Sequence, residues 1–392
     1  MKAGIAVLVL AYGLSQFYRA FLAVLAPDLQ TDIGAMPDDL AFASGVWFIV
    51  FAVMQIPVGA ALDTVGPKAT AVVLFAIGAA GGAFLFSVAQ TPLHVTLAMG
   101  LIGVGCSPVL MAGYYIFAKT YAPAVFATLA GAMLGLGSLG NLASAEPMAR
   151  AVVAFGWRET MQGLAMLSAL IAMLLWVFLK NPPREEVTLR GSVLDLLKMP
   201  QLWPLFALVF VNYAPAAGLR GLWAGPYMAD VYQADAALIG RVTLIMGCAM
   251  IAASFVYGPL ERLFGTRKWV IVAGNAASTV ALLVLFAVPA PGIWMSTALL
   301  AIIGFGGSSF PLLVAHGKAF LPAHLTGRGV TLINLFGIGG VGVAQFITAP
   351  LHSYGTRVSD AAAGPYALIF VFFAVTVLCG LIAYLFVQER TD

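Results

Sequence analysis

Charged side chains are scarce in this sequence. Only 9% of the 392 residues are Asp, Glu, Lys or Arg, whereas 62% are hydrophobic. A soluble domain carries roughly a quarter charged residues, so this chain has too little polar surface to face water on every side. The composition excludes an ordinary soluble domain and predicts a polytopic membrane protein.

Motifs for covalent, metal and nucleotide chemistry are also missing. Cys106, Cys248 and Cys379 fall inside apolar runs without a C-x-x-C pair, so we expect them to be small buried packing residues. No G-x-x-x-x-G-K-[ST] loop for ATP occurs, and the net charge of +3 forms no basic patch for nucleic acid. No Ser-His-Asp, Cys-His or paired-carboxylate arrangement is visible. We therefore expect neither an enzyme nor a cofactor.

Long apolar runs dominate what is present. A membrane-spanning helix needs roughly 20 mostly apolar residues. The sequence predicts twelve such spans, at about 4–27, 40–62, 69–89, 94–118, 125–147, 159–179, 202–228, 237–259, 269–289, 293–315, 329–350 and 365–387. The first run is longer than the ~7–15 apolar residues of a signal peptide and lacks a convincing cleavage site, so we interpret it as a retained span.

A polar stretch, Lys180–Lys198, separates the first six spans from the last six. The sequence therefore predicts an all-α integral membrane protein with an N-terminal six-helix half (1–180), a cytoplasmic linker (181–200) and a C-terminal six-helix half (201–392). With the N-terminus inside, thirteen Lys and Arg fall in cytoplasmic segments and four in outer segments. This bias predicts that both termini face the cytoplasm, and we expect a bacterial inner membrane.

The two halves repeat at an offset of 201 residues. Tyr12 and Arg19 in the first span correspond to Tyr213 and Arg220 in the seventh, and G-V-G-C-S at 103–107 corresponds to G-F-G-G-S at 304–308. Two parallel repeats of this kind predict a pseudo-twofold axis along the membrane normal, with a binding site between the halves.

The loop after the second span reads G-A-A-L-D-T-V-G-P-K, from Gly59 to Lys68. It resembles the signature loop of the major facilitator superfamily, G-x-x-x-D-x-x-G-x-[RK], with Asp63, Gly66 and Lys68 in the matching positions. A degenerate second copy, Gly258–Lys268, follows the eighth span. The resemblance implies a solute transporter of twelve spans. We expect Gly59, Asp63, Gly66 and Lys68 to form a conformational latch at the inner ends of neighbouring helices.

Two departures from the family pattern bear on coupling and direction. Many proton-coupled members carry an arginine in the fourth span where this chain has Met99, so their proton relay is not carried over. Antiporters that export drugs carry G-P-x-x-G-G in the fifth span. The corresponding stretch here, Gly131–Asn141, contains no proline, which favours uptake over drug export.

Two arginines lie inside predicted spans. Arg19 and Arg220 are expected about two turns inside the outer ends of spans 1 and 7, where a charge is costly unless it meets water or a partner. Glu146, near the outer end of span 5, is the only acidic candidate inside a span. An anion can supply the match, because guanidinium binds carboxylate or phosphate through two hydrogen bonds. The layout resembles organic-anion transporters of the family, which place arginines on these two helices.

Further polar and aromatic residues complete the predicted substrate site. Each either shares a predicted helix face with one of the arginines or is a polar position in an otherwise apolar span. They are Tyr12, Gln16, Asn141, Tyr213, Trp223 and Gln345. Asn141 and Gln345 could equally be interhelical hydrogen-bonding residues. In a purely structural alternative, Arg19 pairs permanently with Glu146, and Arg220 reaches outward to Asp230.

The sequence thus predicts a secondary active transporter that moves a small organic anion by alternating access, as a monomer in the bilayer. Proton-coupled uptake is expected, with Glu146 as the candidate proton carrier unless a substrate carboxylate carries the proton. One alternative is an exporter of hydrophobic compounds, which would require acidic groups to attract cations. Another is a copper importer in which Met246 and Met250, one helical turn apart, bind Cu(I).

Overall fold

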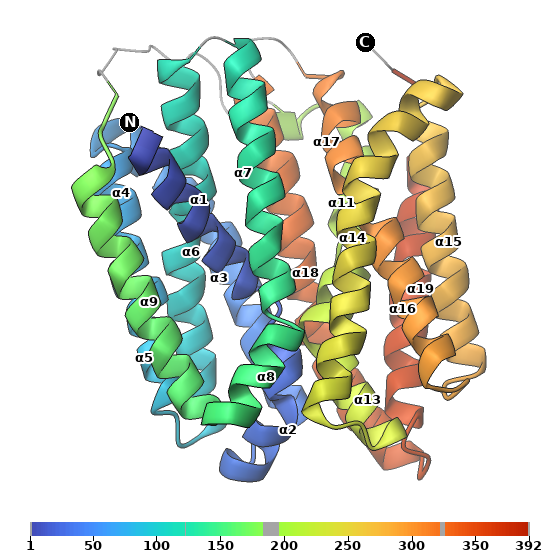
Figure 1. The fold of residues 1–392 in the computed structure, drawn as a ribbon. Helices are drawn as coiled ribbons and strands as arrows, with labels where there is room; N and C mark the ends of the chain where they lie inside the picture. The colour runs from blue at the N-terminus through green and yellow to red at the C-terminus, as the bar shows by residue number, and fades with distance from the viewer. Residues whose placement is uncertain (1, 122, 183–195, 322–325, 391–392) are drawn as a thin grey trace. The chain divides into compact units, whose positions relative to one another are not determined.

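The computed structural model describes residues 2–121, 123–182, 196–321 and 326–390, and within these ranges the chain is helical and has no strand (Figure 1). It divides into two compact units, Met1–Val187 and Thr188–Asp392. The boundary falls in the predicted linker 181–200, of which 183–195 lie outside the described residues.

The first unit consists of apolar helices joined by short turns. In chain order they are α1 (Lys2–Phe17), α2 (Leu22–Ile33), α3 (Pro37–Thr64), α4 (Pro67–Leu74), the π-helical turn η1 (Phe75–Ala80), α5 (Gly81–Ser87), α6 (Pro92–Thr120), α7 (Pro123–Ala143), α8 (Glu146–Phe155) and α9 (Trp157–Phe178). Helices α4, η1 and α5 follow one another without a gap and form one span, Pro67–Ser87.

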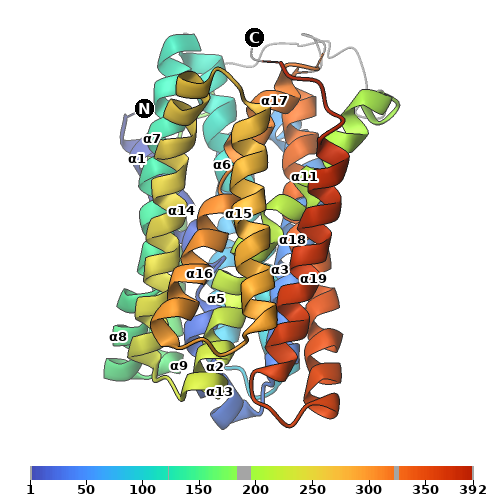
Figure 2. The same cartoon turned by 90° about the vertical axis from the view of Figure 1, so that its right-hand side faces the viewer.

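The second unit repeats this organisation with more interruptions (Figure 2). Its elements are the 3₁₀ turn η2 (Pro200–Leu202), α11 (Trp203–Asn212), α12 (Ala214–Gly218), the π-helical turn η3 (Leu219–Trp223), α13 (Ala224–Tyr232), α14 (Ala236–Phe264), α15 (Lys268–Ala287), α16 (Ile293–Gly307), α17 (Phe310–Lys318), α18 (Thr326–Val358) and α19 (Gly364–Tyr384). The elements from η2 to α13 form a single span, Pro200–Tyr232.

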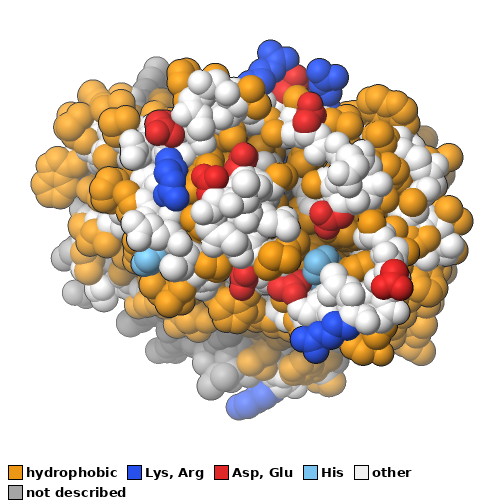
Figure 3. Space-filling view, turned by 90° about the horizontal axis from the view of Figure 1, so that it is seen from below, with side chains coloured by type: hydrophobic (Ala, Val, Ile, Leu, Met, Phe, Trp, Pro, Cys, Tyr) orange, Lys and Arg blue, Asp and Glu red, His pale blue; other side chains and the backbone are white. Residues whose placement is uncertain are grey.

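The predicted all-α, twelve-span fold is confirmed. In the described part of the chain, ten helices or helix runs are long and apolar enough to cross a bilayer, and the bent pair α1–α2 is an eleventh. Helix α7 corresponds to the remaining predicted span. Helices satisfy their own backbone hydrogen bonds, which is why apolar helices suit the hydrocarbon interior. Figure 3 looks onto one end of the molecule, where acidic and basic side chains lie among uncharged ones and hydrophobic side chains surround them at the edge.

The first span differs from the prediction of one continuous helix over 4–27. Helix α1 ends at Phe17, residues 18–21 form a non-helical turn, and α2 then runs at an angle of 53° to α1. No glycine or proline occurs between Phe17 and Leu22, so the usual sequence signals for a break are missing.

Proline and glycine mark many of the other helix ends. Pro37, Pro67 and Pro92 begin α3, α4 and α6, where the missing backbone N–H costs no helical hydrogen bond. Gly34 and Gly265 end α2 and α14 in the left-handed conformation, with φ of 67° and 62°.

Close packing in the first unit depends on glycine and aromatic residues. A Cβ at Gly140 of α7 would collide with the backbone carbonyl of Gly13 in α1, so the two helices touch backbone to backbone. Without a hydrophobic driving force in lipid, such close van der Waals packing holds helices together. Elsewhere in this unit the Tyr18 hydroxyl lies 3.0 Å from Ser168 Oγ, and Trp157 Nε1 donates to Asp32 Oδ2 at 2.8 Å.

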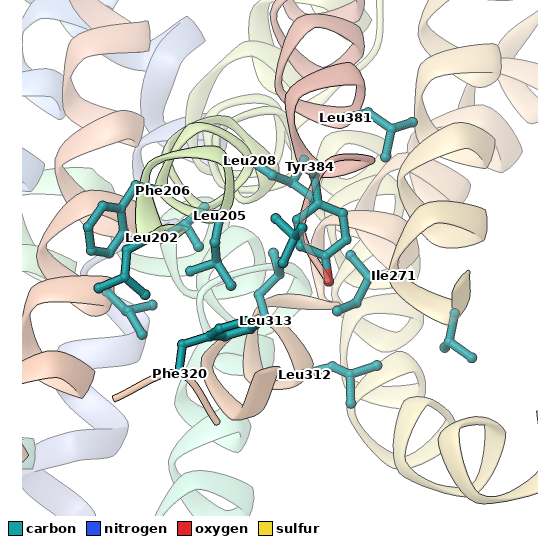
Figure 4. Close-up of a cluster of buried hydrophobic side chains, with 14 of the residues drawn as sticks. Leu202, Leu205, Phe206, Leu208, Ile271, Leu312, Leu313, Phe320, Leu381 and Tyr384 are labelled. Atoms are coloured by element: carbon teal, nitrogen blue, oxygen red, sulfur yellow. The ribbon is translucent and has the colours of Figure 1, made fainter. Parts of the chain in front are cut away.

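The second unit has a hydrophobic cluster near the ends of α11, α15, α17 and α19 (Figure 4). Its labelled members are Leu202, Leu205, Phe206, Leu208, Ile271, Leu312, Leu313, Phe320, Leu381 and Tyr384. The Tyr384 hydroxyl contacts His316 Nδ1 at 2.5 Å, and His316 Nε2 lies 3.0 Å from the Gln388 carbonyl. Because a carbonyl only accepts, Nε2 carries the proton and Nδ1 accepts from the tyrosine.

A carboxylate of the C-terminal segment caps the start of α15. Glu389 accepts hydrogen bonds from Thr266 Oγ1 at 2.7 Å, from the backbone N–H of Arg267 at 3.0 Å and from that of Lys268 at 3.2 Å. Partial burial raises the pKa of Glu389, but these hydrogen bonds outweigh it and hold the pKa below its ordinary value of 4.5. The carboxylate thus satisfies backbone donors that the helix itself leaves open.

The prediction that all three cysteines are buried is wrong for two of them. Cys106 is buried, but Cys248 and Cys379 are exposed on the surfaces of α14 and α19. Small apolar residues are equally at home against lipid, so an apolar run does not distinguish a helix face that packs on protein from one that meets hydrocarbon.

Candidate functional site

Arg19 lies in the break between α1 and α2, not on a helix face. The backbone here makes tightened turns, with Arg19 N–H bonded to the Gln16 carbonyl at 3.4 Å and Ala20 N–H bonded to the Phe17 carbonyl at 3.1 Å. The prediction that Arg19 shares a helical face with Tyr12 and Gln16 is therefore wrong. Gln16 Nε2 instead donates to the Tyr12 hydroxyl at 2.6 Å within α1.

Two aromatic rings of α3 adjoin the Arg19 guanidinium. Its Cζ atom lies 5.6 Å from the centre of the Trp47 ring and 5.0 Å from that of Phe51, and these two rings stack at 5.1 Å and 17°. Cation–π attraction favours this placement. Arg19 Nε is buried, and the residues that the structure describes offer it no hydrogen-bond partner. No described carboxylate forms an ion pair with Arg19.

Glu146 does not lie inside the fifth span as predicted. Helix α7 ends at Ala143, and Glu146 begins the separate short helix α8. Its Oε1 accepts from Arg150 Nη2 at 2.5 Å and from Arg150 Nε at 3.2 Å. The permanent pair between Arg19 and Glu146 that the structural alternative requires is not formed, because Glu146 is paired one turn along its own helix.

Arg220 of the second unit is buried, at 2% exposure. It lies in the π-helical turn η3, and its Nε donates to the Thr243 carbonyl of α14 at 3.1 Å. The 201-residue offset aligns η3 with the break at 18–21, so both arginines lie where their span departs from α-helical geometry. Such irregular turns recur at functional sites. Asp230, the predicted outward partner of Arg220, accepts a hydrogen bond from the Tyr366 hydroxyl.

Trp223 does not share a face with Arg220 as predicted, because the π-turn rotates the two side chains toward different helices. The Trp223 indole N–H donates to Gln345 Oε1 and to Thr348 Oγ1 of α18, both at 3.0 Å. Gln345 Nε2 also donates to the Gly218 carbonyl at 3.4 Å. The structure thus brings two predicted site residues, Trp223 and Gln345, into one buried network within the second unit.

Tyr213 and Asn141 make other contacts. Tyr213 separates α11 from α12, and its ring lies 6.2 Å from that of Phe310. Asn141 is half-buried in α7, and its backbone carbonyl accepts from Ser144 Oγ at 2.8 Å. An asparagine of the second unit, Asn212, does join helices, since its Nδ2 donates to Asn275 Oδ1 at 2.8 Å.

The predicted latch loop turns at Gly66, whose φ of 101° suits only glycine. Just beyond it the Lys68 backbone N–H donates to Asn181 Oδ1 at 2.9 Å, and Lys68 Nζ lies 5.0 Å from the Trp176 ring centre. Gly59 is exposed on α3. The side chain of Asp63 lies outside the described residues, so the role proposed for it stays a prediction.

Several residues around Arg19 were missed in the sequence. Trp47 and Phe51 lie one turn apart in the second span, and this aromatic i, i+4 pair was the available signal. Ser15 of α1 is also buried there, beside the thiol of Cys106. Small and aromatic residues are common in every span, which is why the pair did not stand out.

The methionine pair predicted for copper has a packing role in the structure. A Cβ at Gly304 of α16 would lie 3.0 Å from the Cγ atoms of both Met246 and Met250, so the two side chains fill the α14–α16 contact. The described residues also contain no group of three or more His, Cys, Asp or Glu that is suited to a metal ion.

Comparison with known proteins places this architecture in one family. The family model described as Major Facilitator Superfamily matches residues 8–223 and 205–392. Proteins named probable nitrate transporter NarT from Staphylococcus haemolyticus and Staphylococcus epidermidis are 23% and 24% identical to this chain. These matches span 63% and 55% of this chain and the same shares of the relatives, less than two thirds of their length.

Solved structures show the same fold at low identity. A D-xylose–proton symporter has a TM-score of 0.79 at 15% identity and covers 99% of this chain and 98% of its own. A bacterial homologue of the human lysosomal transporter Spinster has a TM-score of 0.76 at 14% identity, covering 98% and 96%. Since the family model matches nearly the whole chain, from residue 8 to residue 392, the chain belongs to the major facilitator superfamily and is a multi-span membrane transporter, not an enzyme.

Proposed function

We propose that this transporter moves a small monovalent anion by alternating access, with Arg19 and Arg220 as its principal ligands. The observation that carries the proposal is the guanidinium of Arg19, which has a buried Nε without a hydrogen-bond partner and no ion pair among the described residues. A charge within a span is costly unless it is matched. A bound anion supplies that match.

Arg220 supports the same proposal from the second unit. Its guanidinium is buried, and its Nε donates to the Thr243 carbonyl of α14. Planar guanidinium groups bind planar oxygen pairs through parallel hydrogen bonds, which a point-charge ammonium does not reproduce. We therefore assign anion recognition to arginine geometry as well as to charge.

Nitrate is the first substrate to test, because relatives at 23–24% identity are named probable nitrate transporters. Small carboxylates are the second, since carboxylate and nitrate present similar flat arrays of oxygen atoms to a guanidinium. The organic anion expected from the sequence is thus one member of a broader class of small oxoanions.

Proton-coupled uptake completes the proposal. In an inner membrane with both termini in the cytoplasm, the membrane potential opposes anion entry, and a co-transported proton offsets that charge. Nitrate is the conjugate base of a strong acid and is not protonated near neutral pH. In a proton-coupled nitrate transporter, a protein side chain must therefore carry the proton. Glu146 is the candidate, and its protonation would release Arg150. We expect the carrier to function as a monomer.

The signature loop is proposed to govern the switch between conformations. The contacts of Lys68 with Asn181 and Trp176 tie this loop to the end of α9 within the first unit. A change of state that moves α9 against α4 would have to break them, which would make the loop a determinant of turnover and not of affinity.

Anion binding to the purified protein tests the proposed function. Nitrate, formate and acetate are expected to raise the melting temperature, since a ligand stabilises the state that binds it. Arg19→Lys and Arg220→Lys should each weaken binding by on the order of 2–5 kcal/mol. Arg158→Lys is the matched control, because Arg158 donates to the carbonyls of Ser87 and Ala89 and has a structural role. Equal anion affinity in all three variants would contradict the proposal.

A further inference from the structure

We propose that Trp47 and Ser15 bind the same anion as Arg19, so that the Trp47 indole N–H, the Ser15 hydroxyl and the Arg19 Nε–H form a half-site for a planar monovalent oxoanion. The inference rests on the proposed anion transport and adds two ligands to it. All three residues belong to the first unit.

The first observation is a concentration of unsatisfied polar groups. In the described part of the chain, six buried side-chain nitrogen or oxygen atoms lack a hydrogen-bond partner, and three of them are Ser15 Oγ, Arg19 Nε and Trp47 Nε1. Ser15 and Trp47 are 1% and 0% exposed. Native proteins leave few buried donors unpaired, so three together indicate a missing partner. The neighbouring thiol of Cys106 is only a weak hydrogen-bonding group.

The second observation is distance. Arg19 Cζ lies 5.6 Å from the Trp47 ring centre, so the two side chains are neighbours. Two N–H donors can share one acceptor oxygen when their nitrogen atoms are at most about 6 Å apart. Ser15, near the end of α1, and Arg19 are both neighbours of the Cys106 thiol. One small acceptor can therefore contact the guanidinium and the indole, with the hydroxyl as a third donor.

Charge and shape define the class of ligand. The site has one cation and two neutral donors, which matches one negative charge. The faces of Trp47 and Phe51 line one side of the guanidinium and are electronegative, so the anion must approach the edge that carries the N–H groups. A flat oxoanion such as nitrate or formate fits there. Sulfate and phosphate carry more charge and would lose more hydration energy on entering.

The experiment compares two buried tryptophans of the first unit. Trp47→Phe keeps the aromatic ring but removes the N–H, and Trp157→Phe does the same where the N–H is already paired with Asp32. Purified protein is titrated calorimetrically with nitrate, formate and sulfate. Trp47→Phe should bind nitrate and formate about tenfold more weakly than the wild type, which corresponds to about 1.4 kcal/mol. Trp157→Phe should bind like the wild type, and Ser15→Ala should weaken binding less than Trp47→Phe.

A double-mutant cycle identifies a shared ligand. If Trp47 and Arg19 bind one anion, the losses in Trp47→Phe and Arg19→Lys should not add, because the second change removes a contact that the first has already weakened. Fully additive losses would mean that Trp47 acts on the fold and would overturn the inference.

The remaining outcomes separate this inference from the proposed function. A wild-type protein that binds none of the anions overturns both. If the wild type binds an anion, Arg19→Lys weakens that binding and Trp47→Phe leaves it unchanged, only the role of Trp47 is overturned. A buried water molecule would then be the partner of the Trp47 N–H. If Trp47→Phe does not fold, indole ¹⁵N NMR of the wild type replaces it. One of the seven tryptophan N–H signals must then shift with nitrate, and no shift overturns the inference.

Discussion

Gly247 of α14 makes room for the guanidinium of Arg220. A methyl group at Gly247 would lie 2.9 Å from both Nε and Nη2 of Arg220 and 3.2 Å from its Cζ. These contacts involve the far end of a flexible side chain, so the guanidinium would move while the backbone stayed in place. The arginine thus depends for its position on the absence of a side chain one helix away.

Gly247→Ala should impair anion binding more than folding. Displacing the guanidinium disturbs its hydrogen bond to the Thr243 carbonyl, and a hydrogen bond to a charged group is worth about 1.5–3 kcal/mol. We expect at least tenfold weaker binding in a titration of the purified protein, with a melting temperature close to that of the wild type. Gly258→Ala on the same helix is the control, since a Cβ there meets nothing within 4 Å. Unchanged affinity in Gly247→Ala would disconnect Arg220 from the anion.

Glu146→Gln should separate coupling from recognition. The ion pair with Arg150, whose side chain is 77% exposed, contributes little to stability, so the variant is expected to fold and to bind anions normally. Uptake into proteoliposomes should lose its dependence on the proton gradient. Glu159→Gln, which changes another acid of the same unit, should leave that dependence intact. If uptake by Glu146→Gln still follows the proton gradient, Glu146 is not the carrier.

Asn181→Ala should loosen the signature loop. Loss of the hydrogen bond from Lys68 N–H leaves an open donor at the start of α4, and losing a capping side chain costs about 0.5–2 kcal/mol. For a unit of this size, that corresponds to a melting temperature lower by about 2–4 °C per kcal/mol. Asn181→Asp keeps an acceptor oxygen and should restore most of the loss. A fall of equal size in both variants would show that the amide, and not the acceptor, matters.

Glu389→Gln should change the pH dependence of stability. The pKa of Glu389 is lower in the folded state than its ordinary value of 4.5, so the ionised carboxylate stabilises the fold at higher pH. This contribution is fully present above pH 4.5 and is lost as the pH falls through the folded-state pKa. Unfolding measured across this range should show wild type and variant differing at neutral pH and converging in acid. A constant difference at every pH would rule out the ionised form as the cause.

The topology was predictable because it depends on hydrophobicity over long windows. Spans such as 69–89 and 365–387 are recovered as Pro67–Ser87 and Gly364–Tyr384, with errors of a few residues at each end. The signature loop at Gly59–Lys68 and the 201-residue repeat were enough to predict the family, because a loop motif and a repeat are both properties of the residue order.

The local geometry around the arginines was not predictable in the same way. Residues 18–21 have no glycine or proline, and Leu219–Trp223 reads like any other helical stretch. A break or a π-turn is fixed by packing against other helices, which periodicity in one segment does not encode. For this reason the sequence predicted the wrong helix face for the side chains of Arg19 and Trp223. Glu146 was misplaced because α7 ends at Ala143 without a proline or charged residue at that point.

The matching irregular turns at the two arginines bear on how this chain arose. Their positions are one repeat apart, as duplication of a six-helix unit with an arginine at a distorted turn would produce. The same offset pairs Trp47 with Cys248, which lies near Arg220 as Trp47 lies near Arg19. The arginine is therefore present in both halves, whereas the aromatic neighbour in the first half corresponds to a small residue in the second. A chimera built from two copies of the first half would carry two aromatic-lined arginines, and its transport would reveal what the asymmetry contributes.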